Sequence, residues 1–393
     1  MSERVVMDTV LMDALREDFK FLYNALQKHP AILRGQKEKS CLESLYQSKA
    51  DEIISYDSLI HAATELTTFF QDGHTNIEVP YSEKDYCIPL PCDWNEDGSK
   101  LVLNREYEEI PADAQIMGIN GITVEQLISL MAKRIPHENI YLVKSRMILY
   151  PYQNYHLFSE MNLKYLFGAK EAYTVSFKVN GSRQEKSLPL KKYNGFLDFT
   201  DDSNFLAYEI QGNKMIFRLD VCIYNEEYQE ALEKLARLCK ERRLTSFVLD
   251  LSRNMGGNSA VIDEFIKYID TDYFKRYEMT DYSSGEAMSR SSRREAVKNE
   301  RKPICFPAEL YCKVSCHTFS SARTFAVTLK DNGLARIIGT KTGGKPNSYG
   351  LPIKLEMPAS GVRFRVSTSY FRRPDESKDD ADTLETDEEQ EAF

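Results

Sequence analysis

The sequence predicts a mixed α/β protein with a helical start, a small β-rich middle and an α/β core. Apolar residues recur at helical spacing up to about residue 70, and short apolar runs alternate with prolines from 76 to about 200. From residue 205 onward, strand patterns alternate with helix patterns, which is typical of a sheet covered by helices. The 393 residues are enough for two or three domains.

The N-terminal region, residues 1–75, is expected to be helical. Its apolar residues step by three and four along one helical face: Leu15, Phe19, Leu22 and Leu26. His29 and Pro30 should end this helix, because the residue before a proline disfavours the α conformation. Two further helices are expected around 38–50 and 57–70.

Residues 76–200 are expected to form a small β-domain with a helical insert. The Asn-Gly pair at 120–121 is a strong signal for a tight turn between two strands. Residues 124–131 fit a helix, a second helical stretch spans 138–168, and a hairpin within 172–190 should close the domain. The sequence leaves open whether the 138–168 insert acts as a lid.

Residues 201–374 are expected to form the α/β core. One run in it is nearly continuous in apolar residues, as in a strand buried on both faces. The expected strands are 214–221, 245–251 (the apolar run), 309–315, 335–339, 351–357 and 362–370, and the expected helices are 226–242, 258–269 and 321–330. The polar stretch 281–302 between them is expected to be a loop.

The formal net charge of −9 comes entirely from the C-terminus. Residues 375–393 hold ten acids and one base, whereas the remaining 374 residues hold 50 of each. A neutral body excludes a nucleic-acid binder that works through a strong basic field. We expect the acidic tail to be a solvated, disordered extension outside the fold.

Other features bound the class of protein. No apolar run reaches the ~18 residues of a membrane helix, so no membrane span is expected. The start lacks the apolar segment and cleavage site of a signal peptide, which favours a cytoplasmic protein unless a leader has been removed. The eight cysteines are scattered, so reduced, mostly buried thiols are expected. Cys312, Cys316 and His317 have no partner pair at zinc-site spacing, so we expect no metal and no cofactor.

Three loops of the α/β part carry unusual residues. The first follows the buried strand and places Gly256 and Gly257 before a helix, where exposed N–H groups suit negative charge; a plain tight connection is the alternative. In the second, Ser320 or Ser321 fits either a helix N-cap or a nucleophile. The third, residues 339–350, is rich in glycine but departs from the phosphate-loop pattern.

Together these loops resemble the S41 serine peptidases, the class of tail-specific (C-terminal processing) and tricorn-like proteases. Residues 250–257 are similar to the family pattern Asp-Leu-Arg-x-Asn-x-Gly-Gly, 318–322 to its nucleophile segment, and 339–345 to Gly-x-x-Thr-x-Gly-Lys. Residues 72–75 (Asp-Gly-His-Thr) are similar to the end of the family's N-terminal helical region, and 115–124 to part of a PDZ domain. The resemblance implies a crotonase/ClpP-like ββα core and a degenerate PDZ-like domain.

The resemblance also implies a serine endopeptidase that forms an acyl-enzyme on Ser320. In the Ser/Lys members a lysine lies 25 residues after the serine, which selects Ser320 and Lys345. The tricorn-like members use a histidine from the N-terminal region, which corresponds to His74. Lysine must lose a proton that it ordinarily holds until about pH 10.4, whereas imidazole titrates near pH 6.5, so both bases stay open.

Further roles follow from the same resemblance. The backbone N–H groups of Gly256 and Ser321, with Gly257 as a close alternative, are expected to form the oxyanion hole. Asn254 and Tyr349 are expected to support the site, since Tyr349 stands where the family often has a glutamine that orients the lysine.

Two departures from the family pattern stand beside these roles. Ser252 and Arg323 occupy positions where the family usually has Arg and Glu. Separately, Tyr349 in place of the glutamine raises the weight of His74 against Lys345.

The expected partner is a peptide or unfolded protein that binds as an added strand. The sequence is also compatible with a homo-oligomer. The alternative function is a non-proteolytic relative that binds peptide or lipid, and an acyl-transfer enzyme on a related core is a third.

Overall fold

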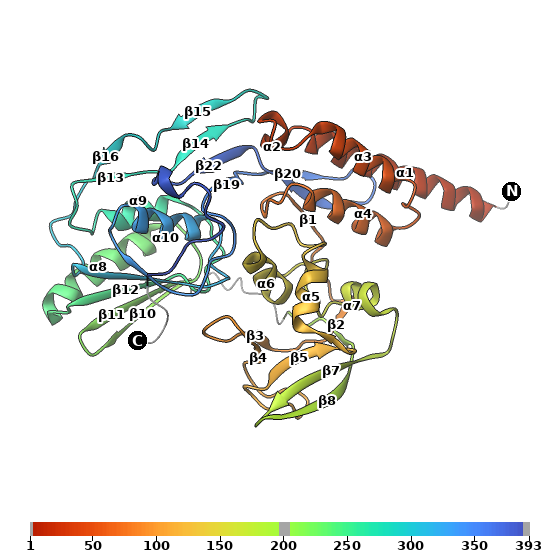
Figure 1. Cartoon of the computed structure of the whole chain (residues 1–393), viewed down its shortest axis with the longest axis horizontal. Helices are drawn as coiled ribbons and strands as arrows, with labels where there is room; N and C mark the ends of the chain where they lie inside the picture. Colours follow the sequence, from red (N-terminus) through yellow and green to blue (C-terminus); the bar gives the residue numbers. More distant parts are fainter. Residues whose placement is uncertain (1–2, 196–204, 388–393) are drawn as a thin grey trace.

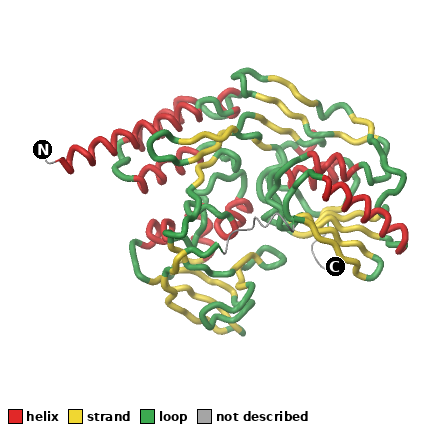
Figure 2. The backbone as a smooth tube through the Cα atoms, turned by 180° about the vertical axis from the view of Figure 1, so that it is seen from behind, coloured by secondary structure: helices red, strands yellow, loops and turns green. Residues whose placement is uncertain are grey.

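The computed structural model describes residues 3–195 and 205–387 (Figure 1). Three regions each have a hydrophobic core of their own. In Figure 1 the N-terminal helices lie at the upper right, the α/β core lies to their left, and the small β region lies beneath the helices. In the view from behind in Figure 2, the N-terminal helices lie at the upper left and the α/β core lies to their right.

The N-terminal region is helical, as the apolar spacing predicts. It contains α1 (Glu3–Leu26), α2 (Pro30–Leu33), α3 (Lys39–Ala50) and α4 (Tyr56–Thr68). His29 does separate two helices: its backbone is extended and its side chain accepts a hydrogen bond from the Ala31 N–H. Ser55 and Ser58 form a capping box that starts α4.

The helices pack on a small antiparallel sheet built from both ends of the chain. Its order is β1 (Asn76–Glu78), β21 (Arg363–Val366) and β20 (Ile353–Glu356). Buried residues of β21 and its neighbours, Met357, Val362, Phe364 and Val366, join the core of the helices. The expected division assigns residues 353–366 to the α/β core of residues 201–374. In the structure these residues instead complete the N-terminal region. A strand pattern shows a strand but not its partner.

The small β region is an antiparallel sheet with three helices. Its strands are β3 (Cys92–Trp94), β4 (Leu101–Leu103), β5 (Gln115–Ile119), β6 (Ile122–Thr123), β7 (Ala172–Val179) and β8 (Ser182–Pro189), and a separate pair joins β2 (Tyr86–Cys87) to β9 (Lys191–Lys192). Its helices are α5 (Val124–Met131), α6 (Ile140–Leu149) and α7 (Glu160–Phe167). The predicted turn is present: Asn120 and Gly121 both have left-handed φ angles of 46° and 82°.

The α/β core is built on a five-stranded sheet of order β10-β11-β12-β17-β18. These strands are β10 (Leu206–Gln211), β11 (Lys214–Leu219), β12 (Ser246–Asp250), β17 (Glu309–Val314) and β18 (Arg336–Gly339), and all pairs but β10–β11 are parallel. The helices α8 (Glu226–Arg242), α9 (Ala260–Ile266) and α10 (Ser321–Asp331) pack on one face (Figure 2). Because parallel strands end at one edge, the three unusual loops meet there.

The stretch expected to be a loop, residues 281–302, instead contains strands. β15 (Met288–Ser291) joins a sheet of order β15-β14-β22-β19, with β14 (Glu278–Asp281), β22 (Ser369–Arg372) and β19 (Ser348–Gly350). β16 (Ala296–Lys298) pairs with β13 (Tyr273–Lys275). Most side chains of β15 and β16 are exposed, so these strands lack the apolar alternation by which a strand is recognised.

The expectation that the whole acidic tail lies outside the fold is wrong for residues 375–387. Leu384 is fully buried in the main core, and Thr383 donates a hydrogen bond to the Thr342 carbonyl. The Asp379 carboxylate pairs with Arg293 at 2.5 Å. Acidic side chains of the tail form ion pairs with basic residues of residues 205–374, such as Asp379 with Arg293 and Asp382 with Lys345. The net charge of the sequence does not predict such pairs. Residues 388–393 of the predicted tail lie outside the described residues.

Two further properties concern the whole described chain. No helix within residues 3–195 and 205–387 is both long and apolar enough to cross a bilayer. All eight cysteines are free, and six of them are buried: Cys87, Cys92, Cys222, Cys239, Cys312 and Cys316. Burial raises the pKa of Cys222 to about 12, against the opposing effect of its hydrogen bond to Asn254. The Cys222 thiol therefore stays protonated and unreactive near neutral pH.

Candidate active site

Ser320 stands at the start of α10 with a backbone that L-residues rarely adopt. Its φ and ψ are 53° and −126°, and strain of this kind costs about 1–3 kcal/mol. The side chain makes no capping hydrogen bond to its helix, so the N-cap alternative does not apply. The loop is held from the preceding core loop, because Thr318 Oγ1 donates to the Leu251 carbonyl and the Phe319 N–H to the Asn254 carbonyl.

His74 lies against Ser320, although 246 positions separate them in the chain. The distance from His74 Nε2 to Ser320 Oγ is 3.0 Å. His74 stands in the turn between α4 and β1, and the pairing of β1 with β21 carries this turn to the edge of the α/β core. Its ring stacks on Phe319, with 4.7 Å between ring centres and 26° between planes.

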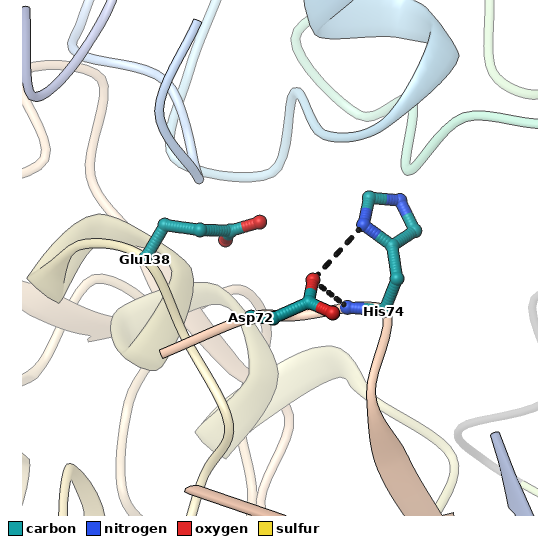
Figure 3. Close-up of side chains that lie close together, drawn as sticks. All are labelled: Asp72, His74 and Glu138. Carbon is teal, nitrogen blue, oxygen red and sulfur yellow. Dashed lines mark hydrogen bonds and ion pairs between the residues drawn. The ribbon is translucent and has the colours of Figure 1, made fainter. Parts of the chain in front are cut away.

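Asp72 anchors the turn that carries His74. It is fully buried, and one of its oxygens accepts from His29 Nε2 at 3.0 Å and from Ser367 Oγ at 2.6 Å. The other oxygen accepts the His74 N–H at 2.9 Å and lies 3.5 Å from His74 Nδ1 (Figure 3). Burial opposes ionisation of Asp72, but its hydrogen bonds with His29 and His74 outweigh it and hold its pKa well below the ordinary value.

The protons on His29 and His74 follow from these contacts. His29 Nδ1 accepts from a backbone N–H, so its Nε2 must carry the proton that is donated to Asp72. If His74 Nε2 accepts the Ser320 hydroxyl proton, then His74 Nδ1 carries the other proton and faces the carboxylate of Asp72. Asp72 then holds the ring in the orientation that presents Nε2 to Ser320.

Glu138 approaches the same place from the opposite side (Figure 3). Donor atoms of Asp72, His74 and Glu138 all lie within 4.8 Å of one another. Both Glu138 oxygens and His74 Nδ1 are buried without a hydrogen-bond partner among the described residues. This donor set has the composition of a cation site. However, Asp72 already accepts three hydrogen bonds. The cationic Arg323 also lies near Glu138, because a Cβ on Gly344 would be 2.7 Å from Arg323 Nη1 and 3.1 Å from Glu138 Oε2. We therefore assign no metal here.

Lys345 is not placed beside Ser320. Its Nζ lies 2.7 Å from Asp382 Oδ1, in an exposed ion pair with the tail, and the described residues include no hydrogen bond between Lys345 and Ser320. Tyr349, expected to orient the lysine, instead bonds Gln36 and packs its ring against His29 at 4.7 Å. Tyr349 therefore supports the histidine side of the site.

The two glycines of the first loop have different roles. A Cβ on Gly256 would lie 2.6 Å from the Cβ of Ser320, so only glycine permits this approach. The Gly256 N–H already donates to Asn254 Oδ1 at 2.8 Å, which leaves it unavailable to substrate. The N–H groups of Gly257 and Ser321 have no hydrogen-bond partner among the described residues. The available donors are thus Gly257 and Ser321, and Asn254 shapes the loop.

A cleft of about 730 Å³ opens over these groups. Ser320, His74, Gly257 and Ser321 line it together with four arginines, Arg146, Arg276, Arg323 and Arg365. Asp72 and Glu138 were not among the site residues predicted from the sequence. The signal for Asp72 was its place in the Asp-Gly-His-Thr motif, whereas no local pattern distinguishes Glu138.

Arg323 and Arg146 flank the ring of Phe319. The Arg323 and Arg146 guanidinium carbons lie 5.6 Å and 5.2 Å from the ring centre. Arg323 is buried and donates to Ser348 Oγ at 2.7 Å, while Arg146 donates to the carbonyls of Gly73 and Pro136. Both cations thus brace the segments on either side of the Ser320–His74 pair.

Residues 217–389 match the model of Peptidase family S41. This segment is an S41 peptidase domain. It contains all three unusual loops, which confirms the resemblance seen in the sequence. No curated protein sequence matches the chain significantly.

Solved structures resemble almost the whole chain, beyond the S41 domain. Mature CPAF complexed with lactacystin has a TM-score of 0.68 at 13% identity, over 93% of this chain and 91% of that one. The photosystem II D1 C-terminal processing protease has a TM-score of 0.51 at 13% identity, over 96% and 93%. A putative peptidase from Parabacteroides merdae ATCC 43184 has a TM-score of 0.51 at 10% identity, over 96% and 89%. At such low identity these likenesses show a shared fold.

Proposed function

We propose that this protein is a serine endopeptidase in which Ser320 is the nucleophile and His74 the general base. The observation that carries the proposal is the 3.0 Å contact between His74 Nε2 and Ser320 Oγ inside the cleft. A serine hydroxyl needs such a base to become nucleophilic. The S41 domain and the strained backbone of Ser320 support the same assignment.

The reaction would proceed in two halves. His74 Nε2 takes the hydroxyl proton as Ser320 Oγ attacks the peptide carbonyl carbon, and the N–H groups of Ser321 and Gly257 bind the oxyanion that forms. The imidazolium then gives its proton to the leaving amine, so the C–N bond breaks and an acyl-enzyme remains. Water attacks this ester, His74 takes the proton of that water, and Ser320 leaves with the proton restored.

The substrate is proposed to bind as an extra strand along β19. Of the described strands, β19 is an edge strand of its sheet, and the segment from Ser348 to Pro352 lines the cleft. An edge strand offers unpaired backbone groups to an extended peptide. Binding through the backbone along an open edge needs no free peptide terminus, which favours an endopeptidase.

A fluorophosphonate probe and a casein assay test the proposal. We expect the wild type to be labelled and active, and both properties to disappear in Ser320→Ala. Ser321→Ala is the matched control: the N–H of residue 321 is kept, so labelling should persist. An unlabelled, inactive wild type would instead favour a non-proteolytic protein that binds peptide or lipid.

A further inference from the structure

Ser145, His317 and Asp93 form a second Ser–His–Asp triad, which lies next to the site. His317 Nδ1 is 2.9 Å from Ser145 Oγ, and His317 Nε2 is 2.8 Å from Asp93 Oδ1. Ser145 is fully buried within α6, so no substrate can reach its hydroxyl. This buried triad must therefore serve a purpose other than nucleophilic attack.

The three residues join two regions of the protein. Asp93 belongs to β3 and Ser145 to α6, both in the small β region, whereas His317 belongs to the α/β core. His317 lies in the loop between β17 and α10, three positions before Ser320. This loop of residues 315–320, hereafter the nucleophile loop, is thus tied to a region that contributes neither the nucleophile nor the histidine beside it.

Apart from the contact of Ser320 with His74, the other hydrogen bonds that the nucleophile loop makes to described segments of the chain all go to the core itself. Ser315 Oγ donates to the Ser252 carbonyl, and Thr318 Oγ1 and the Phe319 N–H reach the same segment after β12. These bonds hold one flank of the loop. His317 provides the side-chain attachment on the opposite flank, to the small β region.

The link is an ion pair in a mostly buried place. Burial opposes a charged ring, but Cys316 and the hydrogen-bonded Asp93 carboxylate raise the pKa of His317 to about 10. Burial likewise opposes ionisation of Asp93, yet His317 and the nearby Arg253 lower its pKa. Asp93 thus faces two cations from two core loops that surround Ser320. Removing one partner would leave an uncompensated buried charge.

The part of the small β region that carries Asp93 is itself braced. Trp94 Nε1 donates to the Lys144 carbonyl at 2.8 Å, and Lys144 Nζ donates to the Gly98 carbonyl at 3.1 Å. The turn at Gly98 lies against the core, since a Cβ there would be 3.7 Å from Thr340 Oγ1. In Figure 1 the loop between β3 and β4 extends toward the core. A rigid support therefore holds Asp93.

We infer that His317 is a positioning residue that, through Asp93 and Ser145, fixes the nucleophile loop to the small β region, so that attack by Ser320 requires this region to be docked. The inference rests on the proposed role of Ser320. His317, Asp93 and Ser145 do not line the cleft, so their loss should displace Ser320 Oγ from His74 without removing substrate contacts. The turnover number should fall while KM stays nearly constant.

The test compares Asp93→Asn, His317→Gln and their double variant with the wild type in peptide hydrolysis and fluorophosphonate labelling. We expect each single variant to lose roughly 10–100-fold in kcat and labelling rate, because small misplacements of reacting groups have effects of that size. KM should change less than about two-fold. The double variant should be no worse than either single one, since both remove the same link. Ser145→Ala, a milder change, should lose only a few-fold in kcat.

Asp18→Asn is the matched control for a purely structural effect. Asp18 is also buried and also joins distant segments, because it accepts the N–H groups of Ala359 and Ser360 at 2.9 Å and 2.6 Å, but it does not touch the nucleophile loop. Its kcat should match the wild type at temperatures where it is folded. Equal loss in Asp18→Asn, additive losses in the double variant, or wild-type labelling in folded Asp93→Asn and Ser145→Ala would each overturn the inference. An unlabelled wild type would overturn the proposed function itself.

Discussion

The two Ser–His pairs of this protein have similar hydrogen-bond lengths but different surroundings. Ser320 and His74 meet at 3.0 Å in a cleft, and the serine has a strained backbone that points its hydroxyl away from its own helix. Ser145 and His317 meet at 2.9 Å in a buried interface, and the serine sits in the middle of a regular helix. Distances alone would not distinguish a reactive pair from a structural one. Access, backbone strain and nearby free N–H groups do so.

The most direct test of whether Ser320 is reactive and Ser145 structural is to remove each serine hydroxyl in turn. Ser320→Ala should lower kcat at least ~10⁴-fold, because the nucleophile itself is lost. Ser145→Ala should stay within ~10-fold of the wild type, since it removes one hydrogen bond and leaves the His317–Asp93 ion pair in place. Steady-state hydrolysis of one peptide by both variants measures the difference. Similar losses in the two would mean that the buried serine also takes part in the chemistry.

The next largest effect concerns the base. His74→Ala should lower kcat about 10²–10⁴-fold, the usual contribution of a general base. Lys345→Ala should change kcat less than ~2-fold, because an exposed ion pair with the tail contributes little. Single-turnover acylation rates of both variants check this. A large loss in Lys345→Ala with a small loss in His74→Ala would reverse the assignment.

The close approach of the first loop to Ser320 gives a third prediction. Gly256→Ala would place a methyl group 2.6 Å from Ser320 Cβ, at a φ of +110° that alanine avoids. Displacement of Ser320 should lower kcat and labelling by roughly 10–100-fold. Gly121→Ala is a control with a positive φ but open space around it, and it should lose stability while keeping activity.

The buried His317–Asp93 pair should make the free energy of unfolding depend on pH. The pKa of His317 is raised to about 10, so the folded state binds a proton that the unfolded state releases above its ordinary value near 6.5. Its stabilisation is complete below about pH 6.5 and is lost as pH rises through 10, by at most about 1.4 kcal/mol per pH unit. Urea unfolding at pH 6, 8 and 10 should find that wild type and His317→Gln converge as pH rises.

Other groups that face His317 bear on this prediction. They are Asp93, which stays ionised over that range, and Cys316, Ser145 and Arg253. A gap in unfolding free energy between wild type and His317→Gln that stayed constant from pH 6 to 10 would show that His317 is neutral in the folded protein.

Local signals predicted much of the fold. The helices 124–131 and 226–242 match their expected ranges. They begin where Thr123 and Asn225 cap their N-termini, and an N-cap acts on residues only two or three positions away. The same holds for the Asn-Gly turn and for Ser320 at a strand-to-helix junction. The polar strands β15 and β16 and the packed tail were missed, because their partners lie far away in the chain.

The sequence by itself determined that an S41-type nucleophile loop and a glycine loop stand at the carboxyl ends of parallel strands, since both follow from local patterns. Only the tertiary structure decided that His74 rather than Lys345 faces Ser320, that Gly257 rather than Gly256 has a free N–H, and that a second histidine ties the nucleophile loop to the small β region. Each of these depends on contacts between segments that are distant in the chain, such as the pairing of β1 with β21. A local sequence pattern predicts that a strand forms but not which strand it pairs with.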